Sequence, residues 1–247
     1  MGKYDGILIC SDLDGTLGEL GGKISKENLD AIKYFIQNGG RFSLSTGRSP
    51  QYAKKLEEIG LCCNAPIIAL NGAIIYDTLK EKILYQNPMD YDKCASITEF
   101  LKEYGSCCDE VVYHSTDSVG DFEDIIDKIL YKVLFVCKDK SNARIFRKAL
   151  EEKYDEGFFI VNSWGEGVEI LDEKSTKGEC VKKMREFSDR PIDKIICVGD
   201  YENDISMLES ADISYAVANA IPEVKAVASR ITVSNKDHAL AAIINEL

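Results

Sequence analysis

The sequence has few positive charges and no long apolar run. Its 30 Lys and Arg residues are outnumbered by 42 Asp and Glu residues, which gives a formal net charge of −12. Such an acidic surface repels the backbones of DNA and RNA, so nucleic acid is not an expected partner. No apolar stretch approaches the ~20 residues that cross a bilayer, and the short apolar run 7–10 leads directly into two aspartates. Neither a membrane partner nor a signal peptide is therefore expected.

The sequence also lacks the cysteine spacing of a zinc site. It has 9 cysteines, but the adjacent pairs at 62–63 and 107–108 do not form Cys-x-x-Cys motifs. An odd number of cysteines, mostly inside apolar runs, is typical of reduced and buried thiols, so we expect a cytoplasmic protein. The two histidines, His114 and His238, have no partner pattern, which favours structural roles.

Strand-like apolar runs alternate with amphipathic helices over the first seventy residues. Residues 6–11 are apolar without alternation, which indicates a buried parallel strand. A helix is expected from the cap Ser25 to about residue 38, then a strand over 41–46. A second helix begins at Pro50 and a third strand covers 66–70. This order predicts a parallel sheet with helices on its faces.

The pattern changes over residues 85–172. Strands with short polar turns follow one another there, and helices are expected at 91–104 and 141–154, which predicts an antiparallel sheet with helices on one face. After this segment the first pattern resumes. We therefore predict an α/β fold in which an open parallel Rossmann-like sheet, from residues 1–84 and 173–247, is interrupted by an inserted α+β cap domain.

Polar residues follow the ends of four strands of the predicted core sheet. Ligands of open α/β sheets bind beyond the carboxyl ends of the strands, so we expect these side chains to converge on one site. They are Asp12, Asp14, Thr46, Gly47, Arg48, Asn71, Asp200, Asn203 and Asp204. Lys177 begins the helix that leads back into the core, near the same edge.

The carboxylates of this set predict a Mg²⁺ site, because several like charges at short range repel strongly without a cation and a hard ion prefers oxygen ligands. Asp12, Asp200 and the carbonyl of Asp14 are the expected ligands. Asp204 is expected to orient the ligand loop without binding the ion. Asp12 can attack phosphorus as a nucleophile. Asp14 can protonate the leaving alkoxide and later deprotonate the attacking water.

The remaining polar residues predict a site for phosphate or substrate. Thr46 and the backbone amides beside it, including that of Gly47, can hold phosphate oxygens. Lys177 supplies positive charge to the same oxygens and screens Asp12 from its acidic neighbours. For three further side chains, binding of the substrate and a structural role both stay open: Arg48, Asn71 and Asn203.

These motifs, in this order, resemble those of the haloacid dehalogenase superfamily, and within it the Cof-type phosphatases. Residues 12–17 (Asp-Leu-Asp-Gly-Thr-Leu) match the first motif, 46–48 the second, 177–178 the third and 199–204 the fourth. The resemblance extends from about Ile7 to Ser234. It implies a magnesium-dependent phosphatase of small phosphorylated metabolites, with the insertion as a cap over the active site.

Two other functions stay open on the sequence. A sugar phosphomutase uses the same Asp12 and Asp14 chemistry but returns the phosphoryl group to the substrate. A receiver-like signalling protein also phosphorylates an aspartate, although it needs no inserted cap. The resemblance allows sugar phosphates, nucleotides or cofactor phosphates as substrates, and the oligomeric state cannot be inferred from the sequence.

Overall fold

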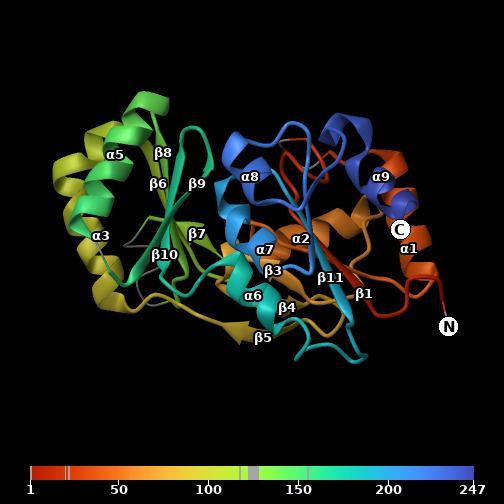
Figure 1. Cartoon of the computed structure of the whole chain (residues 1–247). Coiled ribbons are helices and arrows are strands. Elements are labelled where there is room, and N and C mark those ends of the chain that lie inside the picture. Colours follow the sequence, from red (N-terminus) through yellow and green to blue (C-terminus); the bar gives the residue numbers. More distant parts are fainter. Residues whose placement is uncertain (1, 20, 22, 117, 122–127, 155) are drawn as a thin grey trace.

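The computed structural model describes residues 2–19, 21, 23–116, 118–121, 128–154 and 156–247 (Figure 1). Its first sheet has five parallel strands in the order β13-β12-β11-β1-β2. The strands are β1 (Ile7–Ser11), β2 (Arg41–Leu44), β11 (Lys194–Gly199), β12 (Ile213–Ala216) and β13 (Arg230–Ile231). The fold class predicted from the sequence, an α/β core with a parallel sheet, is confirmed.

Helices cover this sheet and explain why its central strands are apolar on both faces. They are α1 (Lys26–Gln37), α2 (Pro50–Glu58), α6 (Lys177–Lys183), α7 (Ile205–Glu209), α8 (Pro222–Val227) and α9 (Ala239–Glu246). The hydroxyl of Ser25 accepts a hydrogen bond from the Asn28 amide at 3.2 Å and so caps α1 as predicted. Helices α1 and α9 pack against each other at the end of the molecule that holds both termini (Figure 1).

The third predicted strand does not extend the parallel sheet. Instead β3 (Ile67–Ala69), β4 (Ile74–Asp77) and β5 (Lys82–Gln86) form a separate antiparallel sheet. A bridge between Ser45 and Ile68 still links β3 to the end of β2. That bridge is parallel, as predicted, while the turn η1 (Leu70–Gly72), whose three residues have φ of 48°, 54° and 102°, folds the chain back so that β4 pairs antiparallel with β3.

A second five-stranded sheet has the order β7-β6-β8-β10-β9 and is antiparallel throughout. Its strands are β6 (Cys108–His114), β7 (Val119–Gly120), β8 (Lys132–Cys137), β9 (Phe158–Trp164) and β10 (Gly167–Asp172). Helices α3 (Tyr91–Tyr104) and α5 (Lys140–Lys153) cover its outer face and share a hydrophobic cluster with it (Figure 1). Its inner face is turned toward the first sheet.

Two chain segments connect the second sheet to the rest of the molecule, and they are bonded to each other. The side chain of Asn87 donates to Asp172 Oδ1 at 2.7 Å and to Ser175 Oγ at 3.0 Å. Ser175 Oγ in turn donates to the Asn87 carbonyl at 3.0 Å. We call these three residues the clasp. Within the described residues, no helix has both the length and the apolar character needed to span a bilayer.

Candidate active site

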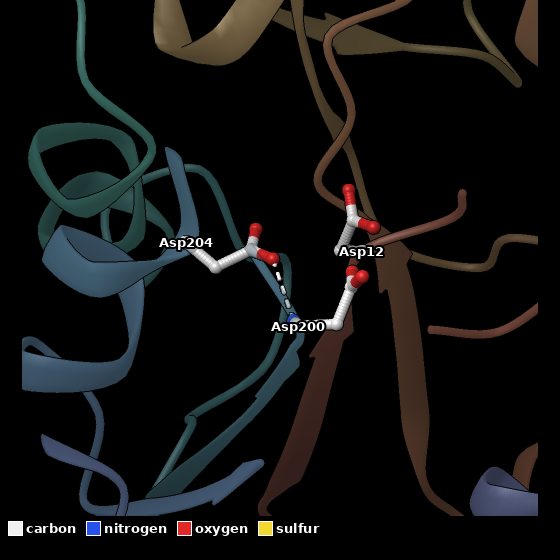
Figure 2. A group of neighbouring side chains, drawn as sticks. All are labelled: Asp12, Asp200 and Asp204. Carbon is white, nitrogen blue, oxygen red and sulfur yellow. Dashed lines mark hydrogen bonds between the residues drawn. The ribbon is translucent and has the colours of Figure 1, made fainter. Parts of the chain in front are cut away.

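Three carboxylates meet beyond the ends of neighbouring strands of the parallel sheet. Asp12 follows β1 and Asp200 follows β11, and these two strands pair in parallel register up to Ser11 and Val198. Asp204 ends the short helix η3 (Glu202–Asp204) just after Asp200. One oxygen of each of the three carboxylates lies within 4.8 Å of the other two (Figure 2). The predicted convergence of these acids on one edge of the sheet is therefore seen.

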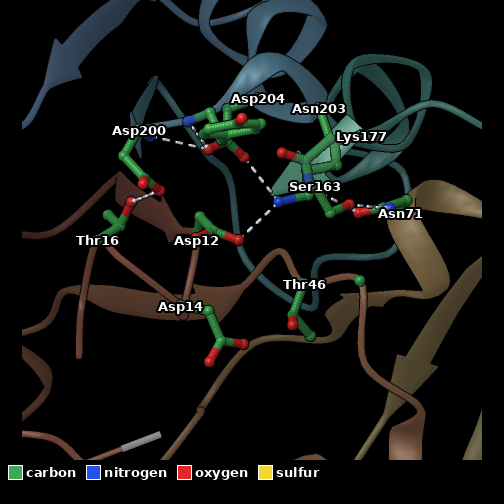
Figure 3. A network of polar contacts seen from close by, with 12 residues as sticks. Asp12, Asp14, Thr16, Thr46, Asn71, Ser163, Lys177, Asp200, Asn203 and Asp204 are labelled. Atoms are coloured by element: carbon green, nitrogen blue, oxygen red, sulfur yellow. Dashed lines mark hydrogen bonds and ion pairs between the residues drawn. The ribbon is translucent and has the colours of Figure 1, made fainter. Parts of the chain in front are cut away.

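Lys177, at the start of α6, bridges two of these acids. Its ammonium group donates to Asp12 Oδ1 at 2.7 Å and to Asp204 Oδ1 at 2.6 Å, and its side chain is fully buried (Figure 3). Burial opposes the charged form, but Asp12 and Asp204 together raise the pKa of Lys177. Lys177 is thus a fixed cation inside a negative cluster.

Asp204 also orders the loop that carries Asp200. Its Oδ2 accepts the backbone amides of Asp200 at 2.9 Å and Tyr201 at 3.2 Å. The hydroxyl of Thr16, two residues beyond Asp14, donates to Asp200 Oδ1 at 2.7 Å. Both oxygens of Asp204 are therefore engaged by the protein.

The cluster is electrostatically unfavourable without a further cation. Burial, and then the charge of Asp204, raise the pKa of Asp200 to about 7. Burial likewise raises the pKa of Asp12, with Asp204 and Asp200 adding to the effect and Lys177 opposing it. Asp200 has no direct bond to Lys177, so its charge is the least compensated of the three.

The first loop approaches Asp200 closely at Gly15. This residue has φ of +90°, and a Cβ atom built there would overlap a carboxylate oxygen of Asp200. The side chain of Asn219 donates to the Gly15 carbonyl at 2.8 Å and fixes the loop from the other side. Glycine is therefore required both for the backbone conformation and for space.

Asp14 points away from the three-carboxylate cluster (Figure 3). Its two oxygens accept Nε and Nη2 of Arg48 at 2.7 and 2.8 Å, and the guanidinium lies 4.1 Å from the ring centroid of Tyr52. This bidentate hydrogen bond to Asp14 is the main cause that raises the pKa of Arg48. Arg48 is thus paired with a predicted catalytic residue rather than with a surface carboxylate.

Asn71 and Asn203 bond to each other. Asn203 Nδ2 donates to Asn71 Oδ1 at 3.0 Å, while Asn71 Nδ2 donates to Ser163 Oγ at 3.2 Å and to Glu169 Oε2. Asn71 has φ of 54° and is completely buried. These contacts give both amides a structural role, and Asn71 links the turn between β3 and β4, and Asn203 of the loop after β11, to β9 and β10.

A pocket of about 540 Å³ opens onto these residues. Seven of the predicted site residues line it: Asp12, Asp14, Thr46, Gly47, Arg48, Asp200 and Asn203. The other three, Asn71, Lys177 and Asp204, are buried behind this lining and reach it through their hydrogen bonds. The second sheet supplies the opposite wall, with His114, Lys132, Trp164 and Glu169 among its residues.

Sequence reasoning did not identify the residues of this opposite wall. Lys132 and Glu169 form a buried ion pair of 2.7 Å, and Lys132 also donates to the Gly47 carbonyl at 2.8 Å. A signal was present, because each is a charged residue inside an otherwise apolar strand run. His114, for which a structural role was expected, also lines the pocket.

Comparisons with known proteins agree on one group. The family model of the haloacid dehalogenase-like hydrolases matches residues 9–121 and 107–244. The putative phosphatase YxeH of Bacillus subtilis is 28% identical over 272 residues, which cover 97% of each chain. A second protein of that organism, the 5-amino-6-(5-phospho-D-ribitylamino)uracil phosphatase YitU, is 26% identical and covers 97% of this chain and 96% of its own.

Solved structures of low identity share the fold. A haloacid dehalogenase-like hydrolase from B. subtilis superposes with a TM-score of 0.84 at 21% identity, covering 97% of this chain and 99% of its own. The subclass IIB sugar phosphatase BT4131 gives a TM-score of 0.80 at 16% identity, covering 97% and 98%.

Proposed function

Since the chain belongs to the haloacid dehalogenase-like hydrolases and is a phosphatase, we propose that it hydrolyses phosphate monoesters of small metabolites through an aspartyl-phosphate on Asp12, with Mg²⁺. The observation that carries this proposal is the cluster of Asp12, Asp200 and Asp204, in which Lys177 bonds to the first and the third, at the edge of a pocket that Asp14 also lines.

The carboxylates fit a hard divalent cation. One oxygen of each lies within 4.8 Å of the other two, burial raises the pKa of Asp200 to about 7, and no lysine or arginine bonds to Asp200 among the described residues. Asp12 and Asp200, with the carbonyl of Asp14, would hold Mg²⁺. Asp204 is already engaged by Lys177 and two amides and would orient them. The ion would neutralise charge on the phosphate and on the acids.

Asp12 is the proposed nucleophile. Lys177 holds its Oδ1 at 2.7 Å, which fixes the carboxylate and offsets part of the negative charge that an anionic ester would meet. Attack on phosphorus forms the acyl phosphate and expels the alkoxide. Thr46 and the amide of Gly47 line the pocket beside Asp12, where they can hold the oxygens of the transferred phosphoryl group.

Asp14 is the proposed acid and base. It protonates the leaving alkoxide, then removes a proton from the water that hydrolyses the acyl phosphate. The two bonds from Arg48 fix the side chain at the pocket wall, apart from the nucleophile. Two carboxylates with different partners can thus perform different tasks.

We further propose that residues 85–172 form a cap that closes this pocket. Arg147 of α5 makes a bidentate ion pair with Glu202, between Asp200 and Asn203, with bonds of 2.6 and 2.7 Å. Lys132 reaches the Gly47 carbonyl from the same side. These contacts support a cap that excludes bulk water from the acyl phosphate.

The test measures phosphate release and the intermediate together. The wild-type protein should release phosphate from small monoesters with Mg²⁺ and lose this activity in excess EDTA. Asp12→Asn should be inactive, whereas Asp30→Asn, at an exposed helix position paired with Lys26, should behave as wild type. Rapid acid quench followed by mass spectrometry should place the phosphoryl group on the peptide that carries Asp12.

Two results would contradict the proposal. Absence of phosphorylated Asp12 peptide at every quench time of a single turnover, together with inversion of configuration at phosphorus in a chiral phosphate ester, would indicate attack by water in one step. Isomerised substrate without released phosphate would indicate a phosphomutase instead.

A further inference from the structure

The inner face of the second sheet carries a group of polar residues that the proposed chemistry does not use. Side chains alternate between the two faces of a strand, so Val133 and Phe135 enter the outer cluster while Lys132 and Leu134 of β8 line the pocket. The antiparallel register places His114 of β6 opposite Lys132. It places Glu169 of β10 opposite Leu134. His114, Lys132 and Glu169 therefore share one side of three neighbouring strands.

Lys132 and Glu169 are an unusual pair for this position. Polar residues on the open face of an antiparallel sheet are normally solvated, yet Lys132 is 3% exposed and Glu169 is 2% exposed. Removing both charges from water costs about as much free energy as their attraction returns, so the pair is a weak source of stability. A binding role explains its place in the pocket wall better than a contribution to folding does.

The hydrogen-bonding capacity that this group leaves open can be counted. Lys132 has three N–H groups, of which two donate to Gly47 O and Glu169 Oε1 at 2.8 and 2.7 Å. Glu169 accepts from Lys132, from Ser163 at 2.9 Å and from Asn71, which uses three of its roughly four acceptor sites. Within the described part of the chain, one donor and one acceptor therefore remain on the ion pair.

His114 adds a second donor and acceptor. Neither ring nitrogen has a hydrogen-bond partner among the described residues, although both atoms are buried. Burial, and then the positive charge of Lys132, lower the pKa of His114 to about 3, so the ring is neutral at pH 7. A neutral imidazole offers one N–H and one acceptor nitrogen. Unpaired buried polar groups are costly, so a ligand that satisfies them binds with a large advantage.

We propose that His114, Lys132 and Glu169 form the subsite for the leaving group and that they select esters of neutral compounds with several hydroxyl groups. This inference rests on the proposed phosphatase function. Each hydroxyl both donates and accepts, as the open capacity of the subsite requires. Lys132 contacts Gly47, next to the predicted phosphate-binding Thr46, so the subsite adjoins the scissile bond.

Charge argues against a second anionic group on the substrate. The cation of the subsite, Lys132, is neutralised by Glu169, and Arg48 on the facing wall is neutralised by Asp14. A carboxylate or second phosphate bound there would lose its hydration without gaining an unpaired cation. An aliphatic leaving group would leave the subsite's donors and acceptors unpaired and should also be a poor substrate.

The test compares esters of similar size with the full-length protein and Mg²⁺. Glycerol 3-phosphate and propyl phosphate differ by two hydroxyls, as glucose 6-phosphate and cyclohexylmethyl phosphate differ by the hydroxyls and the ring oxygen. The wild-type kcat/KM should favour the hydroxylated member of each pair by at least 10-fold, about the effect of one hydrogen bond to a charged group. 3-Phosphoglycerate, which carries a carboxylate, should be a poor substrate.

Three variants connect this preference to the subsite. Glu169→Gln, His114→Phe and the double variant Lys132→Met with Glu169→Gln should each lower kcat/KM about 10-fold more for the hydroxylated ester than for its partner, so that most of the preference is lost. Lys148→Met is the matched control, because Lys148 is exposed on α5, pairs with Glu152 and does not line the pocket. Thermal midpoints and the propyl phosphate rate show that each variant is folded.

The outcomes separate the two proposals. Hydrolysis of all esters without preference, or variants that slow both members of a pair equally, would overturn the subsite and leave the phosphatase proposal intact. A wild-type protein that hydrolyses no ester in the presence of Mg²⁺ would overturn the proposed function and the subsite with it.

Discussion

Replacing Asp200 by asparagine should make the metal-free protein more stable. Burial and Asp204 raise the pKa of Asp200 to about 7, against an ordinary value of 3.8. Between these two pH values the folded state binds more protons at this position than the unfolded state does. Stability contributed by Asp200 therefore falls as pH rises from about 4 to about 7, and is constant above that. The rise in the pKa of Asp200 from 3.8 to about 7 corresponds to a loss of roughly 4 kcal/mol in the free energy of unfolding at pH 8.

Asparagine removes this charge but keeps the acceptor. Thr16 donates to Asp200 Oδ1 at 2.7 Å, and the amide oxygen of Asp200→Asn can accept the same bond. In EDTA at pH 8, the free energy of unfolding from urea titration should rise by up to roughly 4 kcal/mol, and the gain should shrink as the pH is lowered toward 4. Mg²⁺ should stabilise the wild-type protein, by roughly 2.7 kcal/mol at 100 times its Kd, and should stabilise the variant much less.

The exposed Asp30→Asn serves as the control and should change stability by less than about 0.5 kcal/mol at any pH. The reasoning is refuted if Asp200→Asn is no more stable than wild type in EDTA at pH 8. It is also refuted if both proteins show the same dependence on pH and on Mg²⁺, because the carboxylate would then be neither uncompensated nor a ligand.

Three other changes test separate parts of the structure. Asp14→Asn should slow turnover about 10²–10⁴-fold, mostly for esters with poor leaving groups, and should accumulate phosphorylated protein in rapid-quench mass spectrometry; equal slowing for all leaving groups would contradict an acid role. A double-mutant cycle of Arg147→Met and Glu202→Gln should give a coupling energy of about 1 kcal/mol in urea unfolding, because the bidentate pair is only partly exposed; strictly additive effects would show that the pair does not hold. Gly72→Ala should destabilise the protein by several kcal/mol, because φ is +102° and the new Cβ would overlap the Thr176 carbonyl; a wild-type melting temperature would show that the turn can move.

The parts of the fold that could be predicted are those whose signals are local. Asp90 caps α3, and both ends of that helix lie where the sequence places them. The central strands β1 and β11 are continuous apolar runs, so their burial between two layers of helices could be predicted from the sequence. The boundaries proposed for the cap, 85 and 172, stay a prediction.

The errors concern features that local patterns do not encode. The run at 66–70 was correctly read as a strand, but periodicity cannot show whether its partner is parallel β2 or antiparallel β4. Helix α8 and strands β7 and β13 are too short to produce a periodic signal, and none of them was predicted.

The features of the site also fall into those that could be predicted from the sequence and those that could not. Asp12, Asp14 and Asp200 stand at strand ends, and topology alone brings such positions to one edge. The pairing of Arg48 with Asp14 and the contact of Lys132 with Gly47 join residues that are 34 and 85 positions apart. The first contact depends on how the loops after β1 and β2 are folded and the second on how two sheets face each other, and no single segment of the sequence determines either.

The clasp has a mechanical consequence for the second sheet. Because Asn87 and Ser175 bond to each other, the outgoing and returning chains are tied at one point, 88 positions apart in sequence. With two separate attachments, the second sheet could both slide and tilt relative to the first sheet. With a single tied point, it can mainly rotate about that point. We expect the turn between β9 and β10, residues 165–166, to sweep the longest arc when the pocket opens, because it lies at the end of these strands opposite the clasp, whereas Lys132 pairs with Leu171 beside it.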